Sequence, residues 1–183
     1  MMRIKVLAVA LAMLAFTGCV STASRSSTAA LPSYEGWQND VKRVTTPAIP
    51  WLQHRVARGG AKLAIVLDID NTSLETHYHR GAPNKPVLAV ATWAHEHQVA
   101  VLFVTLRDEA DRKNTTNQLT EAGYPVDALC MKTTGEATKP RCRQKLTDDG
   151  YTITANIGNR PTDMRGGNYE KKFQLPDYNG ALA

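Results

Sequence analysis

The chain has 183 residues, of which 43% are hydrophobic and 21% charged, and its formal net charge is +5 at pH 7. This length is sufficient for a single hydrophobic core, and no internal repeat indicates a solenoid. Basic residues are not clustered with interleaved aromatic residues, so the composition indicates no specific binding to a nucleic-acid scaffold and is compatible with small anionic substrates.

The first residues resemble an export signal. Two basic residues precede an apolar stretch over residues 6–16, which is too short for a comfortable transmembrane helix. A Thr-Gly-Cys sequence ending at Cys19 resembles a bacterial lipobox, although Phe16 stands where leucine is more usual. We predict a lipoprotein signal peptide over residues 1–18 with Cys19 lipidated; the alternative is an ordinary secretory signal with Cys19 incidental.

Removal of that signal would take two of the 22 Lys and Arg residues and none of the 17 Asp and Glu residues, which lowers the formal charge from +5 to +3. Residues 19–32 are rich in Ser, Thr and Ala, so we predict a flexible tether there and a folded domain over residues 33–183. The predicted location is the bacterial cell envelope, with the protein held at a membrane by lipid on Cys19; a secreted soluble protein is the alternative.

Residues 34–57 predict helical segments that are broken at Pro47 and Pro50 and pack on a central sheet. Strands and helices then alternate, which is typical of an α/β domain with a mainly parallel sheet. The predicted strands are residues 62–68, 99–105, 126–131, 151–157 and 171–175, and the predicted helices are residues 86–97, 108–122 and 140–149.

Two carboxylates, Asp68 and Asp70, follow the first of these strands. Residues i and i+2 of an extended chain point to the same side, so both acids face the crevice where open α/β sheets bind ligands. Burying two acids together without a cation is unfavourable, so the pair indicates a metal ion, a division into nucleophile and proton donor, or both. Taken alone, the Asp-x-Asp-x-Thr pattern also fits a solvated turn or a calcium-type loop.

Side chains that suit phosphate follow the second and third strands. Thr105 and Arg107 end the second strand, and Lys139 begins the helix after the third. A hydroxyl, a guanidinium and an ammonium are all able to bind phosphoryl oxygens. Arg107 could equally pair with Asp108 or Glu109 at a helix start. Taken singly, Thr105 and Lys139 also fit a strand-end hydroxyl and a solvated helix residue.

The fourth strand ends in the segment Gly-Asn-Arg-Pro-Thr-Asp, residues 158–163, which brings oxygen ligands to the same edge of the sheet. Such ligands suit magnesium. Lys139 reaches this edge as well, and we predict that its partner is Asp68.

Together these segments resemble the four motifs of the haloacid dehalogenase (HAD) superfamily, and in particular its secreted acid phosphatase branch. That branch holds the class B and class C acid phosphatases, plant storage-protein relatives and bacterial lipoprotein phosphatases. The resemblance covers roughly residues 45–180. It implies that Asp68 is a nucleophile that forms an aspartyl-phosphate and that Asp70 is the general acid and then base. Thr105 matches the second motif, and Lys139 the third.

The resemblance also implies a Rossmann-like fold, with a five-stranded sheet in the order 3-2-1-4-5, helices on both faces and a minimal cap. Predicted elements fill most of the chain between the motifs, so residues 75–85 are the only insertion and a large lid cannot fit. The implied cofactor is Mg²⁺, and its implied ligands are Asp68, Asp70, Asn159 and Asp163.

Two residues depart from the family pattern. Asn159 stands where the first metal-binding aspartate of the fourth motif is usual, which removes one negative charge and predicts weakened or rearranged metal binding. Leu106 replaces the usual small residue between Thr105 and Arg107, where it would narrow the pocket or reorient the arginine.

These observations predict a magnesium-dependent acid phosphatase that hydrolyses small phosphomonoesters such as nucleotides or phosphorylated metabolites. The alternative is a catalytically weak or inactive surface lipoprotein that keeps the fold and binds phosphorylated ligands. Dehalogenation is disfavoured, because that reaction has no oxygen leaving group for Asp70 to protonate.

The cysteines bear on the compartment. With Cys19 assigned to lipid, Cys130 and Cys142 remain as an even pair in a chain expected outside the cytoplasm, where disulfides persist. They would close a short loop next to Lys139. Two separate thiols, one on the strand and one on the helix, are the alternative.

Overall fold

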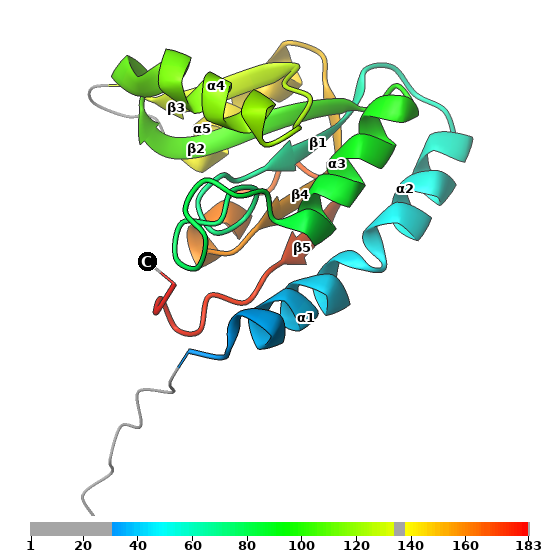
Figure 1. The fold of residues 1–183 in the computed structure, drawn as a ribbon. Coiled ribbons are helices and arrows are strands. Elements are labelled where there is room, and N and C mark those ends of the chain that lie inside the picture. The colour runs from blue at the N-terminus through cyan, green and yellow to red at the C-terminus, as the bar shows by residue number, and fades with distance from the viewer. Residues whose placement is uncertain (1–30, 134–137, 183) are drawn as a thin grey trace, which may run out of the picture.

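Five parallel strands form one sheet in a computed structural model that describes residues 31–133 and 138–182 (Figure 1). The strand order is β3-β2-β1-β4-β5. The predicted α/β fold, the parallel sheet and its order are therefore confirmed. The strands are β1 Leu63–Leu67, β2 Ala100–Asp108, β3 Ala128–Lys132, β4 Thr152–Gly158 and β5 Lys171–Gln174.

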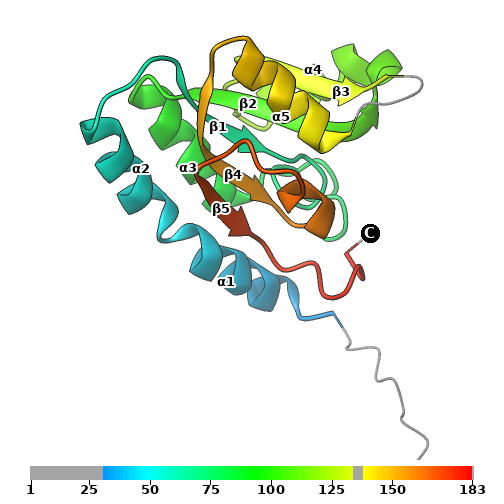
Figure 2. The same ribbon diagram turned by 180° about the vertical axis from the view of Figure 1, so that it is seen from behind.

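Helices cover both faces of the sheet, with α1 to α4 on one side and α5 on the other (Figures 1 and 2). Two short 3-10 helices, η1 and η2, follow β2 and β4. The helical elements are α1 Tyr34–Thr45, α2 Ala48–Ala57, α3 Lys85–Glu96, η1 Glu109–Asp111, α4 Arg112–Glu121, α5 Lys139–Asp148 and η2 Pro161–Met164.

The central strand β1 is buried along its whole length, as its unbroken apolar sequence requires. Ile65 and Leu67 enter the larger core, which the N-terminal helices and α3 cover, while Ala64 and Val66 enter a smaller core under α5. Apolar contacts on both faces fix the position of β1 in the sheet. They thereby also fix the position of the residues that directly follow β1.

The path of the chain creates a crevice at the end of β1. From β1 the chain runs through α3 to β2 and through α4 to β3, and α5 then returns it to β4 on the other side of β1. Right-handed crossovers in opposite directions place α3 and α5 on opposite faces. The ends of β1 and β4 therefore border a point where the strand order reverses, which is the ligand-binding position of open α/β sheets.

Three predicted boundaries were wrong: the break at Pro50, the end of the second strand at residue 105, and the start of the next helix at residue 108, which the structure places at Arg112. The N-terminal helices are broken at Pro47, but α2 runs through Pro50. Pro50 lies in the first turn of α2, where the missing N–H would have no partner in the helix in any case. The second strand continues beyond Thr105 to Asp108, and its pairing with β3 shifts register after Val104.

The predicted signal peptide over residues 1–18, the lipidation site at Cys19 and most of the predicted tether lie outside the described residues. Within residues 31–133 and 138–182, no helix is both long enough and apolar enough to cross a membrane.

Candidate active site

A tight turn directly after β1 presents Asp68 and Asp70. The Asp68 amide continues the β1–β4 ladder by donating to Ile157 O at 3.0 Å. Asn71 then adopts a left-handed backbone with φ of 52°, which Asn tolerates better than most residues. Ser73 Oγ donates back to Asp68 O at 2.7 Å and closes the turn. Asp68 is 6% exposed, whereas the Asp70 carboxylate faces the open cleft with 45% of its side chain exposed.

Asp68, Lys139 and Asp163 form a buried charge cluster. Lys139 Nζ donates to Asp68 Oδ1 at 2.5 Å, and it also donates to Asp163 Oδ1. The predicted pairing of Lys139 with Asp68 is confirmed. Lys139 belongs to the first turn of α5, and Pro140 follows it at a position where helices accept proline.

The cluster shifts the pKa values of Asp68 and Lys139. Burial raises the pKa of the Asp68 carboxyl above its ordinary value; Lys139 opposes that shift and Asp163 adds to it. Burial alone would lower the pKa of Lys139, but Asp68 and Asp163 together raise it above its ordinary value. The ammonium therefore keeps its proton and favours the ionised form of Asp68.

Thr72 joins Asp68 to Asn159. Its hydroxyl lies 3.1 Å from Asp68 Oδ2 and 3.3 Å from Asn159 Oδ1, and it accepts from the Asn159 amide at 3.1 Å. A carboxylate oxygen and an amide oxygen thus converge at the reversal point of the sheet, and oxygen donors of this kind fit a hard divalent cation. Among the residues that the structure describes, no three His, Cys, Asp or Glu side chains gather to hold a metal. Asp68 and Asn159 supply the two oxygen atoms that lie beside Thr72.

Both oxygens of the Asp163 carboxylate accept hydrogen bonds from protein neighbours. Its Oδ1 accepts from Lys139, and its Oδ2 accepts from the Arg160 amide at 2.8 Å. Gly158 makes this position possible, because a Cβ there would lie 2.3 Å from Asp163 Oδ2. In this arrangement Asp163 orients Lys139.

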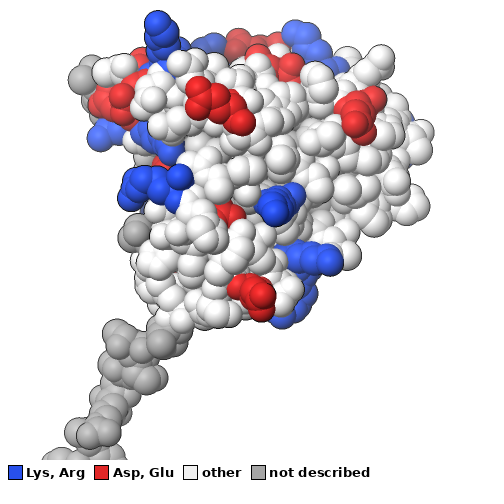
Figure 3. All heavy atoms as spheres, in the orientation of Figure 1, with Lys and Arg blue, Asp and Glu red and all other residues white. Residues whose placement is uncertain are grey.

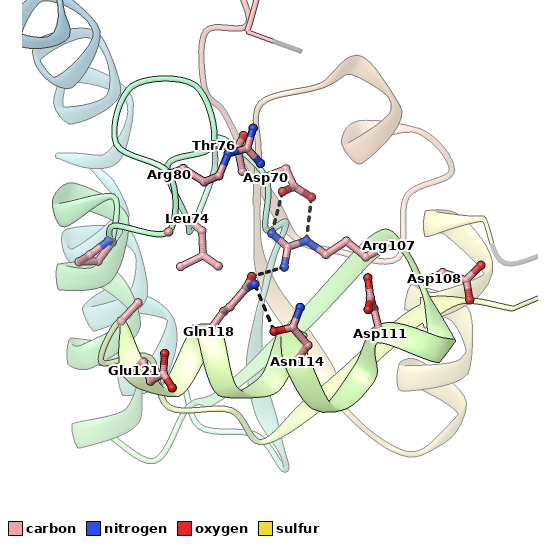
Figure 4. Close-up of a pocket in the computed structure, with 13 residues that line it drawn as sticks. Asp70, Leu74, Thr76, Arg80, Arg107, Asp108, Asp111, Asn114, Gln118 and Glu121 are labelled. Carbon is pink, nitrogen blue, oxygen red and sulfur yellow. Dashed lines mark hydrogen bonds and ion pairs between the residues drawn. The ribbon is translucent and has the colours of Figure 1, made fainter.

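Arg107 forms a bidentate ion pair with Asp70 (Figure 4). Its Nε and Nη2 lie 3.0 Å and 2.8 Å from the two Asp70 oxygens, and its Nη1 donates to Gln118 Oε1 of α4 at 2.8 Å. The alternative in which Arg107 pairs with Asp108 or Glu109 is therefore wrong. Those acids accept instead from Ala110 N and from Arg112.

The candidate residues line one cleft of about 500 Å³. Thr105 is buried at its base and accepts from the Arg107 amide at 3.1 Å, while Leu106 is 49% exposed at its rim. An adjoining recess of about 620 Å³ lies between the loop after β1 and α4 (Figure 4). Of the predicted site residues, the cleft is lined by Asp68, Asp70, Thr105, Arg107, Lys139 and Asn159, and Asp163 lies behind Lys139.

Sequence reasoning missed Arg143 as a residue that supports the site. Its side chain is buried and donates to three backbone carbonyls of residues 163–167: Asp163 O at 2.8 Å, Gly167 O at 2.8 Å and Arg165 O. Arg143 follows Lys139 by one helical turn and so shares its face of α5. That spacing is the sequence feature from which Arg143 could have been found. The contacts of Thr72 and Gln118 in the site were also not predicted from the sequence.

Cys130 and Cys142 form a disulfide that ties β3 to α5, with their Cα atoms 5.8 Å apart. Of the two interpretations of this pair, the bridge is confirmed. Because Cys142 lies three residues after Lys139, the bridge also anchors the turn that carries the ammonium.

Replacing both bridge cysteines with serine should lower the free energy of unfolding by about 3 kcal/mol, because the bridge closes a loop of about 13 residues in the unfolded chain. Urea denaturation of the folded domain with and without the double substitution measures this. A reducing agent should produce the same loss in the unmutated protein and none in the variant. Equal midpoints for the oxidised protein and the variant would contradict the prediction.

Comparison with known proteins places the site in a family. The sequence model of the HAD superfamily, subfamily IIIB (acid phosphatase), matches residues 79–181. The match covers more than half of the chain but begins after Asp68 and Asp70, so the placement of those two acids rests on the geometry above. No curated protein sequence matches the chain.

Solved structures agree in fold. The chain is similar to the class C acid phosphatase from Bacillus anthracis, with a TM-score of 0.65, 16% identity and coverage of 81% of this chain and 83% of that one. It is similar to the tungstate-bound crystal structure of the class C acid phosphatase from that organism, with a TM-score of 0.64, 16% identity and the same coverage. On the family match, the chain belongs to subfamily IIIB of the HAD superfamily, the acid phosphatases, and is a phosphomonoesterase.

Proposed function

We propose that the protein is a magnesium-dependent acid phosphatase that hydrolyses small phosphomonoesters through an aspartyl-phosphate on Asp68. One observation carries the proposal. The Asp68 carboxylate lies at the end of β1 at the reversal point of the sheet, with an ammonium on one oxygen and the Thr72 hydroxyl beside the other. It is held in place and borders an open cleft, as a nucleophile must be.

In the first half of the reaction, an Asp68 oxygen attacks phosphorus and the bond from phosphorus to the leaving oxygen breaks. Asp70 gives that oxygen its proton. In the second half, water attacks the phosphorus of the aspartyl-phosphate, Asp70 takes the proton of the water, and Asp68 is released as a carboxylate. Lys139 and the Thr105 hydroxyl hold phosphoryl oxygens at the base of the cleft.

Arg107 acts on Asp70 in this scheme. An ionised carboxylate accepts both donors of the guanidinium fork strongly, whereas a protonated carboxyl carries a hydrogen on one oxygen, and that oxygen accepts more weakly. Protonation of Asp70 would therefore weaken one of its two bonds to Arg107. Gln118 keeps Arg107 in place during that change.

Asp68 and Asn159 would hold the magnesium ion, with Asp70 and Asp163 beside them. When bound, the ion supplies positive charge that stabilises the phosphoryl group in the transition state. Divalent metal use is general among HAD phosphatases, and the choice of magnesium rests on the all-oxygen donor set.

Export to the cell envelope and attachment through lipid at Cys19 complete the proposal. The disulfide supports an oxidising compartment, since such bridges rarely persist in the cytosol. Charged side chains of both signs are interspersed on the face shown in Figure 3, so that face offers no continuous basic surface. Mass spectrometry of the mature N-terminus distinguishes a lipidated Cys19 from an ordinary secretory cleavage; an unmodified N-terminus would exclude the anchor.

Hydrolysis of a generic aryl phosphate by the purified domain, titrated with magnesium after chelation, tests the proposal. Activity should disappear on chelation and return with magnesium. Asn159→Asp should reduce the magnesium concentration needed for half-maximal activity, because it restores a negative charge to the predicted metal shell. An unchanged magnesium requirement would show that residue 159 is not a metal ligand. No turnover at any magnesium concentration would favour the phosphate-binding, inactive alternative.

A further inference from the structure

We infer that Arg80 is the guanidinium that binds the substrate phosphoryl group, in addition to the residues already placed around it. This inference rests on the proposed phosphatase function and adds a binding residue from outside the recognised motifs. Arg80 belongs to the loop between β1 and α3, and its side chain lines both the catalytic cleft and the adjoining recess. It therefore borders the position where a phosphomonoester has to lie.

The other cations of the cleft already have anionic partners. Lys139 is paired with Asp68 and Asp163, Arg107 with Asp70, and Arg160 lies 3.8 Å from Asp177. Within the described part of the chain, Arg80 makes no ion pair or hydrogen bond. It is thus the one lining cation, among the described residues, whose charge is not already matched by an acid of the protein. A phosphate group brings negative charge that needs such a donor.

The backbone beneath Arg80 is held in a closed turn. Gly81 N donates to Glu75 O at 2.8 Å, Glu75 N donates to Ala82 O at 2.8 Å, and Ala82 N donates to His79 O at 2.9 Å. Gly81 has a φ of 87°, a conformation that glycine adopts without strain. These contacts fix where the Arg80 side chain starts.

A buried acid attaches the same turn to the core. The Glu75 side chain is 1% exposed, and its oxygens accept from Tyr34 Oη of α1 at 3.0 Å and lie 3.0 Å from His79 Nδ1. Asn71, in the turn that carries the catalytic acids, accepts from the amide of Thr76 at 3.0 Å. The turns that bear Asp70 and Arg80 are therefore connected directly. This connection holds the backbone at Arg80 close to the turn that bears Asp70.

Asp70 lies between the two arginines. In Figure 4, Arg80 and Thr76 lie on the opposite side of Asp70 from the Arg107 guanidinium. The sequence pattern assigns substrate binding to Arg107, but that side chain is committed to Asp70 and to Gln118. The two arginines thus have different roles: Arg107 positions Asp70, and Arg80 binds the anionic phosphoryl group of the substrate.

Binding of inorganic phosphate, measured by calorimetry on the whole folded domain with magnesium, tests Arg80 without requiring turnover. Arg80→Ala should weaken phosphate binding about 10- to 100-fold, the range of a charge-assisted bond. Arg80→Lys should fall between wild type and Arg80→Ala, because it keeps the charge but loses the planar fork. Arg112→Ala is the matched control, since Arg112 carries the same charge, pairs with Glu109 and lines neither cavity.

Kinetics on an aryl phosphate separate this inference from the proposed function. Arg80→Ala should raise KM and the inhibition constant of phosphate together, with a smaller change in kcat. If the wild-type protein binds phosphate but shows no turnover, and Arg80→Ala loses the binding, the role of Arg80 is supported and the phosphatase proposal is contradicted. Turnover with equal phosphate affinity in Arg80→Ala and Arg112→Ala would overturn Arg80 alone. A change confined to substrates with an anionic leaving group would also overturn it, because Arg80 would then bind the leaving group.

Discussion

Replacing Asp68 with Asn is expected to lower kcat/KM by at least about three orders of magnitude, because an amide cannot form the phosphoenzyme. The substitution removes a charge from a buried cluster, but Lys139 keeps Asp163 as its partner, so the fold should survive. Turnover of an aryl phosphate measures the effect, and thermal unfolding checks the fold.

A covalent intermediate makes the Asp68 test more specific. Acid-quenched wild-type protein should carry phosphate on the peptide that contains Asp68, and mass spectrometry should find none on Asp68→Asn. Conservation of turnover near the wild-type level in a folded variant would rule out the mechanism.

Asp70→Asn should be nearly as damaging for alkyl phosphates and milder for aryl phosphates. An alkoxide leaves poorly without a proton, and general acid catalysis typically contributes about 10²- to 10⁴-fold, whereas a phenolate needs little help. The measurement is kcat/KM for the two substrate types in parallel.

The contacts of Arg107 supply a control for the Asp70 experiment. Gln118→Ala removes the hydrogen bond that Arg107 makes to α4 but leaves both bonds between Arg107 and Asp70. Its kcat/KM should therefore fall much less than that of Asp70→Asn. Equal losses on alkyl and aryl phosphates in Asp70→Asn would show that Asp70 is not the general acid.

Local sequence patterns predicted most of the fold. The apolar run of β1 marked a strand that is buried on both faces, and the alternation of strands and helices marked a parallel sheet. The strand order followed from the family resemblance. The break predicted at Pro50 was wrong because the effect of a proline depends on its position in the helix, and that position is set by where α2 begins.

The candidate site was predictable where each residue is tied to a strand end. Asp68 and Asn159 reach the cleft because parallel strands finish at one edge, and this follows from strand direction alone. Thr105 lies two residues beyond the last pair of β2 with β1, at the same edge. Lys139 could be assigned to Asp68 because an unpaired buried acid requires a cation.

By itself, the sequence determined the sheet, the positions of the strand ends and the kinds of side chain that follow them, since these depend on short-range periodicity and on motif order. Only the tertiary structure decided which charges pair. Arg107 and Asp70 are 37 residues apart, and their pairing depends on how α4 and the turn after β1 pack. The same packing leaves Arg80 without an acid partner among the described residues. Side-chain pairing is decided by distances of a few ångströms between separate elements, and chain order does not specify those distances.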